Sequence, residues 1–444
     1  MNTPICDFVR DYAARRPDRL HMPGHKGRGE AEQLDITEIT GADVLYHPRG
    51  IILESEKNAA ALFGSRRTVY SAEGSSLSIR AMVFLAMQDA RKRGKTPRIA
   101  AGRNAHKVFI TAAALLDVQV QWLYPARTGS LLTCQITPET LEEALGQGEP
   151  VTAVYITSPD YLGNVADISG LSRVCRRYGC LLLVDNAHGA YLGFLPGGQH
   201  PMAQGADMCC DSAHKTLPVL TGGGYLHISS HAPGELDSMA DSAMALFAST
   251  SPSYLILQSL DAANGILDGS WKRALHQAVI EWAAVKRHIG DLGFCLTGQE
   301  PLKLTVMPKQ YGYTGEQLAE RLEQKNIYCE FADPDYLVLM LPVEYDPALP
   351  RRLCAAFEAI APRAEITTPA PTLGRGVSVL SPHAALFHPA EQVALSQALG
   401  RVMADPTVSC PPAIPVVCCG ERIDAWAVEA MEYYGITQVR VLCP

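Results

Sequence analysis

Short apolar runs alternate with stretches of helical periodicity between about residues 54 and 230, and this alternation limits the fold more than any other feature of the sequence. Such a pattern predicts β-α units in which helices pack on a largely parallel sheet. The expected strands are Arg98–Ala101, Val118–Trp122, Val151–Ile156, Cys180–Val184, Ala206–Cys210 and Gly224–Ile228. The expected helices are Leu77–Arg91, Lys107–Leu116 and Ile168–Tyr178. This central region should therefore form an α/β domain.

The pattern restarts after a long helical stretch from Ser253 to about Ile289. The strands expected beyond it are Leu302–Met307, Ile327–Phe331 and Tyr336–Leu341. With 444 residues and 47% hydrophobic content, the chain can bury more than one core. We therefore expect an N-terminal segment (1–50), a large domain (51–265), and linking helices with a smaller C-terminal α/β domain (266–444).

Bulk charge and cysteine spacing exclude several classes of protein. The chain has 38 Lys and Arg against 46 Asp and Glu, a formal charge of -8, which argues against general binding to nucleic acid or anionic membranes. Charges interrupt the N-terminal segment and no later stretch is long enough to span a bilayer, so a cytoplasmic location is expected. The 13 cysteines include no C-x-x-C pair, so we expect neither a disulfide framework nor a metal site.

The segment with the most chemistry is Asp211-Ser212-Ala213-His214-Lys215-Thr216, directly after an expected strand. Ligand sites in α/β sheets lie at such strand ends. A lysine there can form a Schiff base with an aldehyde cofactor, which is how pyridoxal phosphate (PLP) enzymes prepare for amine substrates. Taken alone, the segment is equally compatible with a surface lysine beside a hydrogen-bonded histidine.

A second strand end carries a carboxylate. The apolar run Cys180–Val184 leads directly into Asp185-Asn186-Ala187-His188, upstream of Lys215. In a PLP enzyme, such a carboxylate pairs with the pyridine nitrogen and keeps it protonated. The alternative is an Asp that caps the next loop. Its place before a candidate Schiff-base lysine favours the cofactor role.

Two further segments come directly before expected helices. Small residues in Glu73-Gly74-Ser75-Ser76 at a helix start predict a phosphate site, which Ser212 and His214 would complete. An ordinary helix cap is the alternative. In Arg103-Asn104-Ala105-His106-Lys107, the imidazole of His106 could lie flat on the pyridine ring or face solvent in a loop.

These segments, in this order, resemble the Orn/Lys/Arg decarboxylase family of fold type I PLP enzymes. The resemblance covers most of the chain and includes LHMPGHKG at 20–27, DITE at 35–38, HPRG at 47–50, DYLG at 160–163, TSPSY at 250–254, PPAIP at 411–415 and GERI at 420–423. It implies an α/β fold of the aspartate aminotransferase type, with a mostly parallel sheet in the large domain and a smaller C-terminal α/β domain. The implied activity is removal of the α-carboxylate from arginine, lysine or ornithine, giving an amine and CO2.

The resemblance also implies roles for individual residues. Lys215 would carry the Schiff base, Asp185 would pair with the ring nitrogen, and His106 would stack on the ring. His188 would lie close to the reacting atoms. Further cofactor contacts are implied for Gly74, Ser75, Ser76, Ala187, Ser212 and His214.

Two more roles follow from the assembly and the closing motif. Because the family builds its site at a subunit interface, we expect a homodimer or higher homo-oligomer in which Ser251 reaches the neighbouring subunit's cofactor. Glu421, in the GERI motif, is the best candidate to bind the distal cation of a basic amino acid.

Several departures from the family pattern affect the substrate more than the cofactor. Asn186 stands where Glu is usual, Tyr191 replaces a common His, and Gly222–Gly224 is expected to loosen the loop after Lys215. A PLP-dependent aminotransferase or lyase, and a catalytically silent PLP-binding protein, therefore remain alternatives. An NAD-binding Rossmann protein is disfavoured, because no G-x-G-x-x-G follows an expected strand.

Overall fold

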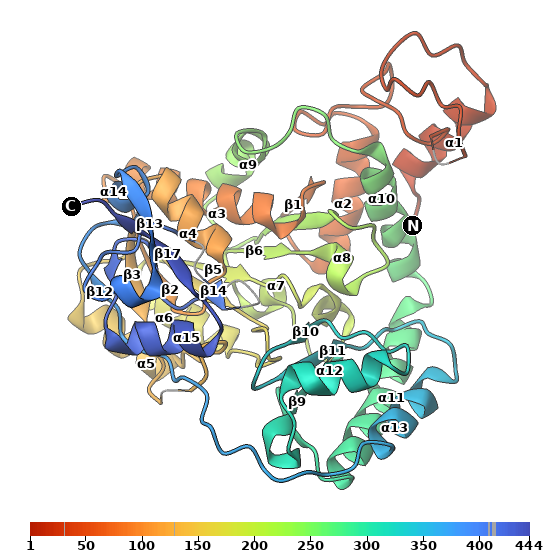
Figure 1. Ribbon diagram of the computed structural model, residues 1–444. Coiled ribbons are helices and arrows are strands. Elements are labelled where there is room, and N and C mark those ends of the chain that lie inside the picture. The colour runs from red at the N-terminus through yellow and green to blue at the C-terminus, as the bar shows by residue number, and fades with distance from the viewer. Residues whose placement is uncertain (31, 128, 407–408, 411–413) are drawn as a thin grey trace. The chain divides into compact units, whose positions relative to one another are not determined.

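The computed structural model describes residues 1–30, 32–127, 129–406, 409–410 and 414–444 (Figure 1). The chain divides into two compact units. Unit 1 comprises residues 1–100, 145–158 and 167–272, and unit 2 comprises residues 101–144, 159–166 and 273–444. Each unit is therefore assembled from segments that are far apart in the sequence.

Unit 1 contains a sheet whose strands lie in the order β1-β7-β6-β5-β4-β2. Strands β4, β5 and β6 are parallel, whereas β7 pairs antiparallel with both β6 and β1. The bounds are β1 (Arg67–Ser71), β2 (Arg98–Gly102), β4 (Ala153–Thr157), β5 (Leu181–Asp185), β6 (Met208–Asp211) and β7 (Gly224–Ile228). The last two residues of β2 belong to unit 2.

The helices of unit 1 bury apolar faces against this sheet. α3 packs along β1, β5, β6 and β7, and α9 packs on α3, while α6 contacts β5 and α7 (Figure 1). In α6, apolar side chains recur at helical spacing and are buried, whereas Arg173 and Arg176 are exposed. The bounds are α1 (Pro4–Ala14), α2 (Ile51–Phe63), α3 (Gly74–Lys92), α6 (Ile168–Tyr178), η1 (Ala190–Phe194), α7 (Pro201–Gln204), α8 (Ala213–Thr216), α9 (Glu235–Ala245) and α10 (Tyr254–Asp268).

The central strands of unit 1 are buried along their whole length. Every residue of β5, β6 and β7 is buried. Parallel strands covered on both faces are expected to be continuous apolar runs, as these largely are. Their ionisable residues, Asp185, Asp211 and His227, are therefore exceptions that need hydrogen-bond partners.

Unit 2 begins with the end of β2, followed by α4 (Lys107–Leu115) and β3 (Gln119–Leu123), which is the neighbour of β2 in sheet order. Its later part contains an antiparallel sheet in the order β10-β11-β9-β8. The bounds here are α11 (Trp271–Asp291), β8 (Cys295–Thr297), β9 (Lys303–Met307), η2 (Pro308–Tyr311), α12 (Gly315–Glu323), β10 (Phe331–Ala332), β11 (Leu337–Met340) and α13 (Leu349–Glu358). Helix α5 (Pro138–Gln147) crosses the division between the units, as does the first turn of α11.

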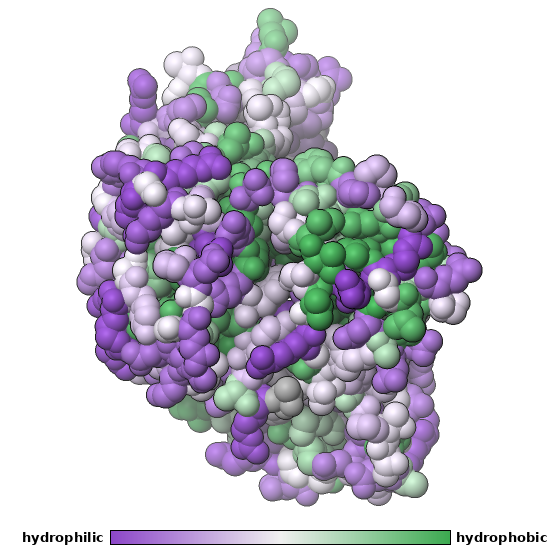
Figure 2. Space-filling model, turned by 90° about the vertical axis from the view of Figure 1, so that its left-hand side faces the viewer, coloured by the Kyte–Doolittle hydropathy of each residue, from purple (hydrophilic) through white to green (hydrophobic). Residues whose placement is uncertain are grey.

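The C-terminal elements of unit 2 form three two-stranded pairs, β12 with β16, β13 with β17 and β14 with β15. Their bounds are β12 (Val377–Ser378), α14 (Pro382–Leu386), β13 (Ala390–Ala394), η3 (Leu395–Gln397), β14 (Ser409–Cys410), β15 (Ile414–Pro415), β16 (Glu421–Arg422), α15 (Ala425–Tyr433) and β17 (Gln438–Leu442). Figure 2, viewed from the left of Figure 1, shows hydrophobic residues gathered on part of a largely hydrophilic face. Among the described helices, none is both long and apolar enough to cross a bilayer.

Most of the expected elements are confirmed to within two residues. β7 and α6 have the predicted bounds, and β2, β3, β4, β5 and β6 each lie close to theirs. The helical stretch expected after Ser253 is confirmed as two helices, α10 and α11, which are separated at Gly269. One expectation was wrong, because only the last residue of Ile327–Phe331 is in a strand. The motif at 411–415 lies partly outside the described residues.

Candidate active site

Two carboxylates mark the carboxyl ends of neighbouring parallel strands in unit 1. β5 ends at Asp185 and β6 ends at Asp211, and Asp185 is level with Cys210 in the parallel register. The two acidic side chains are 2% and 0% exposed. Because ligands of α/β sheets bind at the carboxyl ends of strands, this edge is the expected position of a ligand-binding site.

Asp185 is held by three donors. The Tyr155 hydroxyl donates to Oδ2 at 2.9 Å, while the Ala187 amide and the Cys210 thiol donate to Oδ1 at 3.2 and 3.6 Å. Donors of this kind stabilise a carboxylate in its ionised form. Within the described ranges no cationic side chain pairs with it. A cation supplied by a ligand, such as a protonated ring nitrogen, would complete the pairing.

Lys215 and His188 lie together beside the same strand ends. Lys215 is on the short helix α8, directly after β6, and His188 is in the loop after β5. The Lys215 Nζ lies 3.0 Å from the His188 Nε2. At this distance a proton is shared by hydrogen bonding between the amine and the imidazole. The structure thus places Lys215 and His188 in contact beside the strand end that carries Asp185, and the sequence predicted these three residues separately.

The predicted phosphate residues converge at the start of α3. The Ser212 hydroxyl donates to the Ser75 hydroxyl at 2.8 Å and accepts from the Ser75 amide at 3.4 Å. Gly74 opens the helix, and a Cβ at this position would lie 3.3 Å from the His214 ring. Ser76 follows in the first turn. Serine hydroxyls that meet at the start of a 19-residue helix suit a phosphate group.

The glycine run after Lys215 is tightly packed rather than loose, which corrects the expectation from the sequence. A Cβ at Gly222 would lie 2.9 Å from the Ala72 carbonyl oxygen, and one at Gly224 would lie 2.9 Å from the Asp211 carbonyl oxygen. Gly222 also has a φ of +101°, a conformation that favours glycine. The glycines therefore let this loop approach the start of α3.

Ser251 lies in an exposed segment that is tied to the same helix start. Glu73, which precedes α3, accepts a hydrogen bond from the Ser249 amide at 2.7 Å, and the Ser249 hydroxyl accepts from the Ser251 amide at 3.2 Å. The Ser251 side chain itself is exposed. It is therefore accessible from outside the chain.

Two predicted residues belong to unit 2. His106 is the N-cap of α4, where its Nδ1 accepts the Val108 amide at 3.3 Å. Its stacking role stays a prediction. Glu421 is 1% exposed, and its Oε2 accepts from the Arg103 guanidinium at 3.1 Å and from the Cys418 amide at 2.7 Å. Glu421 thus pairs with a buried arginine and not with the adjacent Arg422, whereas its Oε1 has no hydrogen bond within the described parts of the chain.

Arg103 is the residue of unit 2 that sequence reasoning missed. It is 1% exposed, donates to the carbonyl oxygens of Pro415 and Val416 at 3.0 Å each, and lies over the Trp122 ring. Arg103 therefore holds the C-terminal segment at two points, the backbone carbonyl oxygens of Pro415 and Val416 and the carboxylate of Glu421. In unit 1, Tyr155, which donates to the strand-end carboxylate of Asp185, was missed as well. Nothing in the sequence of a buried strand such as β4 marks one residue as a hydrogen-bond donor.

The residues at this edge of unit 1 fit PLP. A buried carboxylate held by neutral donors suits the ring nitrogen, an amine lies beside an imidazole, and hydroxyls converge at a helix start. These are the three kinds of contact that the cofactor requires. The arrangement is what chemistry at an amine substrate needs.

Comparison with known proteins shows the family of the chain. Residues 3–294 match the family described as "Orn/Lys/Arg decarboxylase, major domain", and residues 379–440 match "Orn/Lys/Arg decarboxylase, C-terminal domain". The uncharacterized protein YaaO of Bacillus subtilis strain 168 is 30% identical over 97% of this chain and 94% of its own length. An arginine decarboxylase of Bacillus anthracis is 29% identical over 95% of this chain and 90% of its own.

A solved structure has the same fold. The constitutive lysine decarboxylase of Escherichia coli superposes with a TM-score of 0.79 over 100% of this chain and 82% of its own, at 18% identity. At that identity the likeness concerns the fold alone. It confirms the expected fold class, an α/β fold with a largely parallel sheet.

We predict that Tyr155→Phe weakens PLP binding roughly tenfold, because Asp185 loses a charge-assisted hydrogen bond worth about 1.5 kcal/mol. Tyr225→Phe is the matched control, since the Tyr225 hydroxyl is equally buried and has no hydrogen-bond partner in the described part of the chain. PLP affinity would be measured by titration of the protein's absorption. Equal affinities in the two variants would contradict the role of Tyr155.

Proposed function

This chain belongs to the Orn/Lys/Arg decarboxylase family and is a PLP-dependent decarboxylase of a basic amino acid, and we propose that its substrate is arginine. The observation that carries the catalytic part is the contact of Lys215 with His188 at the edge where Asp185 ends β5. The support for arginine is the name of a relative that aligns along nearly the whole chain.

The cofactor defines what these residues have to do. When bound, PLP supplies an aldehyde for a Schiff base and a ring that accepts the electrons released as CO2 leaves. Lys215 supplies the amine for the Schiff base. Its Nζ must lose a proton to act as a nucleophile, and the His188 Nε2, 3.0 Å away, is placed to take that proton and return it.

The other proposed contacts bind and orient the cofactor. Asp185 would pair with the ring nitrogen and keep a proton on it, while Ala187 and the imidazole of His106 would hold the ring. Support for the phosphate site comes from the meeting of Gly74, Ser75, Ser76, Ser212 and His214 at the start of α3.

Glu421 is proposed to bind the distal cation of the substrate. Its Oε2 is held by Arg103 and the Cys418 amide, so the carboxylate has a fixed orientation. Its Oε1 has no hydrogen bond among the described residues, and a guanidinium or ammonium group would offset its burial. A substrate cation that lost its hydration on binding would be compensated in the same contact.

A homodimer is proposed as the working assembly. Ser251 is exposed although its segment is fixed to the start of α3, and Leu220 and Leu246 of the same unit are 54% and 59% exposed. Exposed apolar side chains beside a candidate site favour coverage by a second copy. Ser251 would then contribute to the neighbouring subunit's cofactor site.

The substrate proposal is tested with purified, PLP-loaded protein and a panel of arginine, lysine, ornithine and neutral amino acids. We expect CO2 and the corresponding amine in equal amounts, with the highest kcat/KM for arginine, and no release from Lys215→Ala. Formation of a keto acid instead would indicate an aminotransferase. Absence of any product, with the cofactor bound, would indicate a silent PLP-binding protein.

The same panel applied to Glu421→Gln tests the specificity residue. Loss of the carboxylate charge should lower kcat/KM for the basic substrate at least about tenfold and leave the neutral amino acids unaffected. Thermal melting separates this effect from loss of stability, because Arg103 would be left without its anionic partner. An unchanged preference for the basic substrate would contradict the role of Glu421.

The shared site is tested by mixing two inactive variants, Lys215→Ala and Ser251→Trp. In a hybrid dimer with shared sites, one site receives a native lysine and a native serine segment. Random exchange should therefore restore about one quarter of the wild-type activity. If Ser251 acts only within its own chain, mixing restores nothing.

A further inference from the structure

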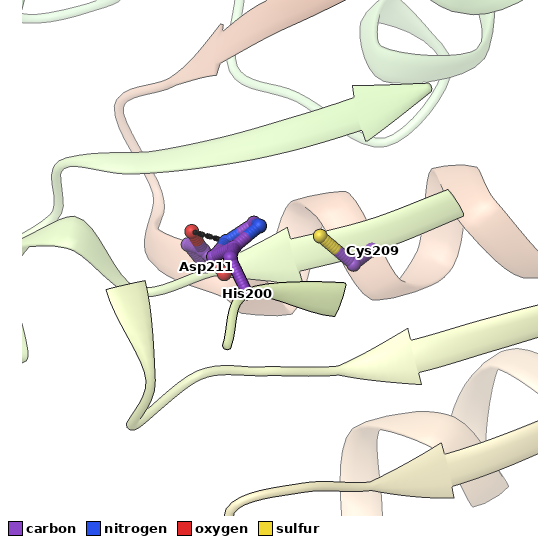
Figure 3. Close-up of side chains that lie close together, drawn as sticks. All are labelled: His200, Cys209 and Asp211. Atoms are coloured by element: carbon purple, nitrogen blue, oxygen red, sulfur yellow. Dashed lines mark hydrogen bonds and ion pairs between the residues drawn. The ribbon is translucent and has the colours of Figure 1, made fainter. Parts of the chain in front are cut away.

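A second buried carboxylate lies next to the cofactor site without belonging to it. Figure 3 shows Asp211 with His200 and Cys209, and all three side chains are buried. Asp211 is 0% exposed and directly precedes Ser212 of the phosphate site. Side chains alternate along β6, and because Cys210 reaches Asp185, Asp211 lies on the opposite face of the strand.

Three N–H groups surround the Asp211 carboxylate. Oδ1 accepts from the Asn186 side-chain amide at 2.7 Å. Oδ2 lies 3.0 Å from the His200 Nε2 and 3.3 Å from the His227 Nε2. The His227 Nδ1 in turn lies 2.8 Å from the Thr68 hydroxyl. Each carboxylate oxygen therefore has a partner, and one of the donors belongs to the residue after Asp185.

Hydrogen bonding fixes the protons and argues against a metal ion at this cluster. The donor atoms of His200, Cys209 and Asp211 lie within 4.8 Å of one another, which would suit a cation. The His200 Nδ1, however, accepts the Met202 amide at 3.3 Å, so the ring proton is on Nε2 and points to Asp211. Metal-bound histidines instead donate from their second nitrogen. Burial also raises the pKa of the Cys209 thiol, which opposes the thiolate a metal requires.

Asp211 is therefore a buried anion that N–H donors stabilise. Burial by itself would raise the pKa of Asp211, but the two imidazoles outweigh burial and hold this pKa well below its ordinary value. Burial lowers the pKa of His227, against the opposing effect of Asp211, which favours the neutral ring. His227 therefore donates to Asp211 as a neutral ring, which stabilises the carboxylate without cancelling its charge.

We propose that Asp211 is a positioning residue that acts on the ring nitrogen of PLP. Asn186 follows Asp185 in the chain and hydrogen-bonds to Asp211, so the two carboxylates are neighbours. The charge of Asp211 adds to the negative potential that keeps the ring nitrogen protonated. The inference rests on the proposed pairing of Asp185 with that nitrogen. Asp211 touches neither cofactor nor substrate in this account. It acts through the low-dielectric interior, where a charge has a longer reach than in water.

Asp211→Asn removes the charge while keeping the hydrogen bonds. The amide oxygen of the new asparagine can take the place of Oδ2 and accept from both imidazoles. Its NH2 group can then donate to the Asn186 Oδ1, once the Asn186 side-chain amide flips. This flip is open because the Asn186 Oδ1 has no hydrogen-bond partner among the residues described. Asp207→Asn is the matched control: Asp207 precedes β6 at its other end and accepts the Leu182 amide at 2.7 Å.

The experiment compares the affinities of each purified variant for PLP and for 1-deaza-PLP, in which CH replaces the ring nitrogen. Calorimetric titration gives both dissociation constants without turnover. Effects on folding or on phosphate binding are common to the two ligands and cancel in the ratio of the constants. We expect Asp211→Asn to raise the ratio of the PLP constant to the 1-deaza-PLP constant about fivefold, and Asp207→Asn to leave it unchanged.

The outcomes separate this inference from the proposed function. Asp185→Asn must raise the same ratio, and by more than Asp211→Asn does. If Asp185→Asn raises it and Asp211→Asn does not, Asp211 has only a structural role and the inference is wrong. If neither variant changes the ratio, the pairing of Asp185 with the ring nitrogen is wrong, and the inference fails with it.

Discussion

The candidate site depends on a buried carboxylate, Asp185, which hydrogen bonds hold at the end of a parallel strand. Asp185 is taken out of water by the strands on either side of β5, which would be costly for an unpaired charge. Donors from Tyr155, Ala187 and Cys210 offset part of that cost, and each comes from a different place in the sheet or its loops. A cationic ring nitrogen would offset the remaining cost of burial, so binding of the cofactor would stabilise this part of the fold.

The parallel sheet explains why the other groups lie where they do. Parallel neighbours end at the same edge, so the loop after β5 delivers His188 to Lys215 on α8, after β6. The glycine loop before the antiparallel strand β7 lies against the start of α3. At this point the Ser212 hydroxyl donates to the Ser75 hydroxyl. The contact of Lys215 with His188 and that of Ser75 with Ser212 thus follow from strand order and from glycines that permit close approach.

Sequence patterns predicted the residues at strand ends and missed the residues that support them. Lys215 and Asp185 could be predicted because an apolar run followed by a polar segment marks a strand end. Tyr155 lies inside a buried strand, and Arg103 pairs with Glu421 across 318 positions, so no local pattern marks either contact. The strand expected at Ile327–Phe331 was wrong, because apolar content alone does not determine where strand pairing begins.

The central claim, that Lys215 carries the cofactor, is tested most directly by reducing the PLP-loaded protein with borohydride and mapping the modified peptide by mass spectrometry. Reduction fixes a Schiff base as a stable secondary amine, so the attachment site survives digestion. The account predicts one pyridoxyl group per chain, on the peptide that contains Lys215 and follows β6. A pyridoxyl group on another lysine, with Lys215 unmodified, would contradict it.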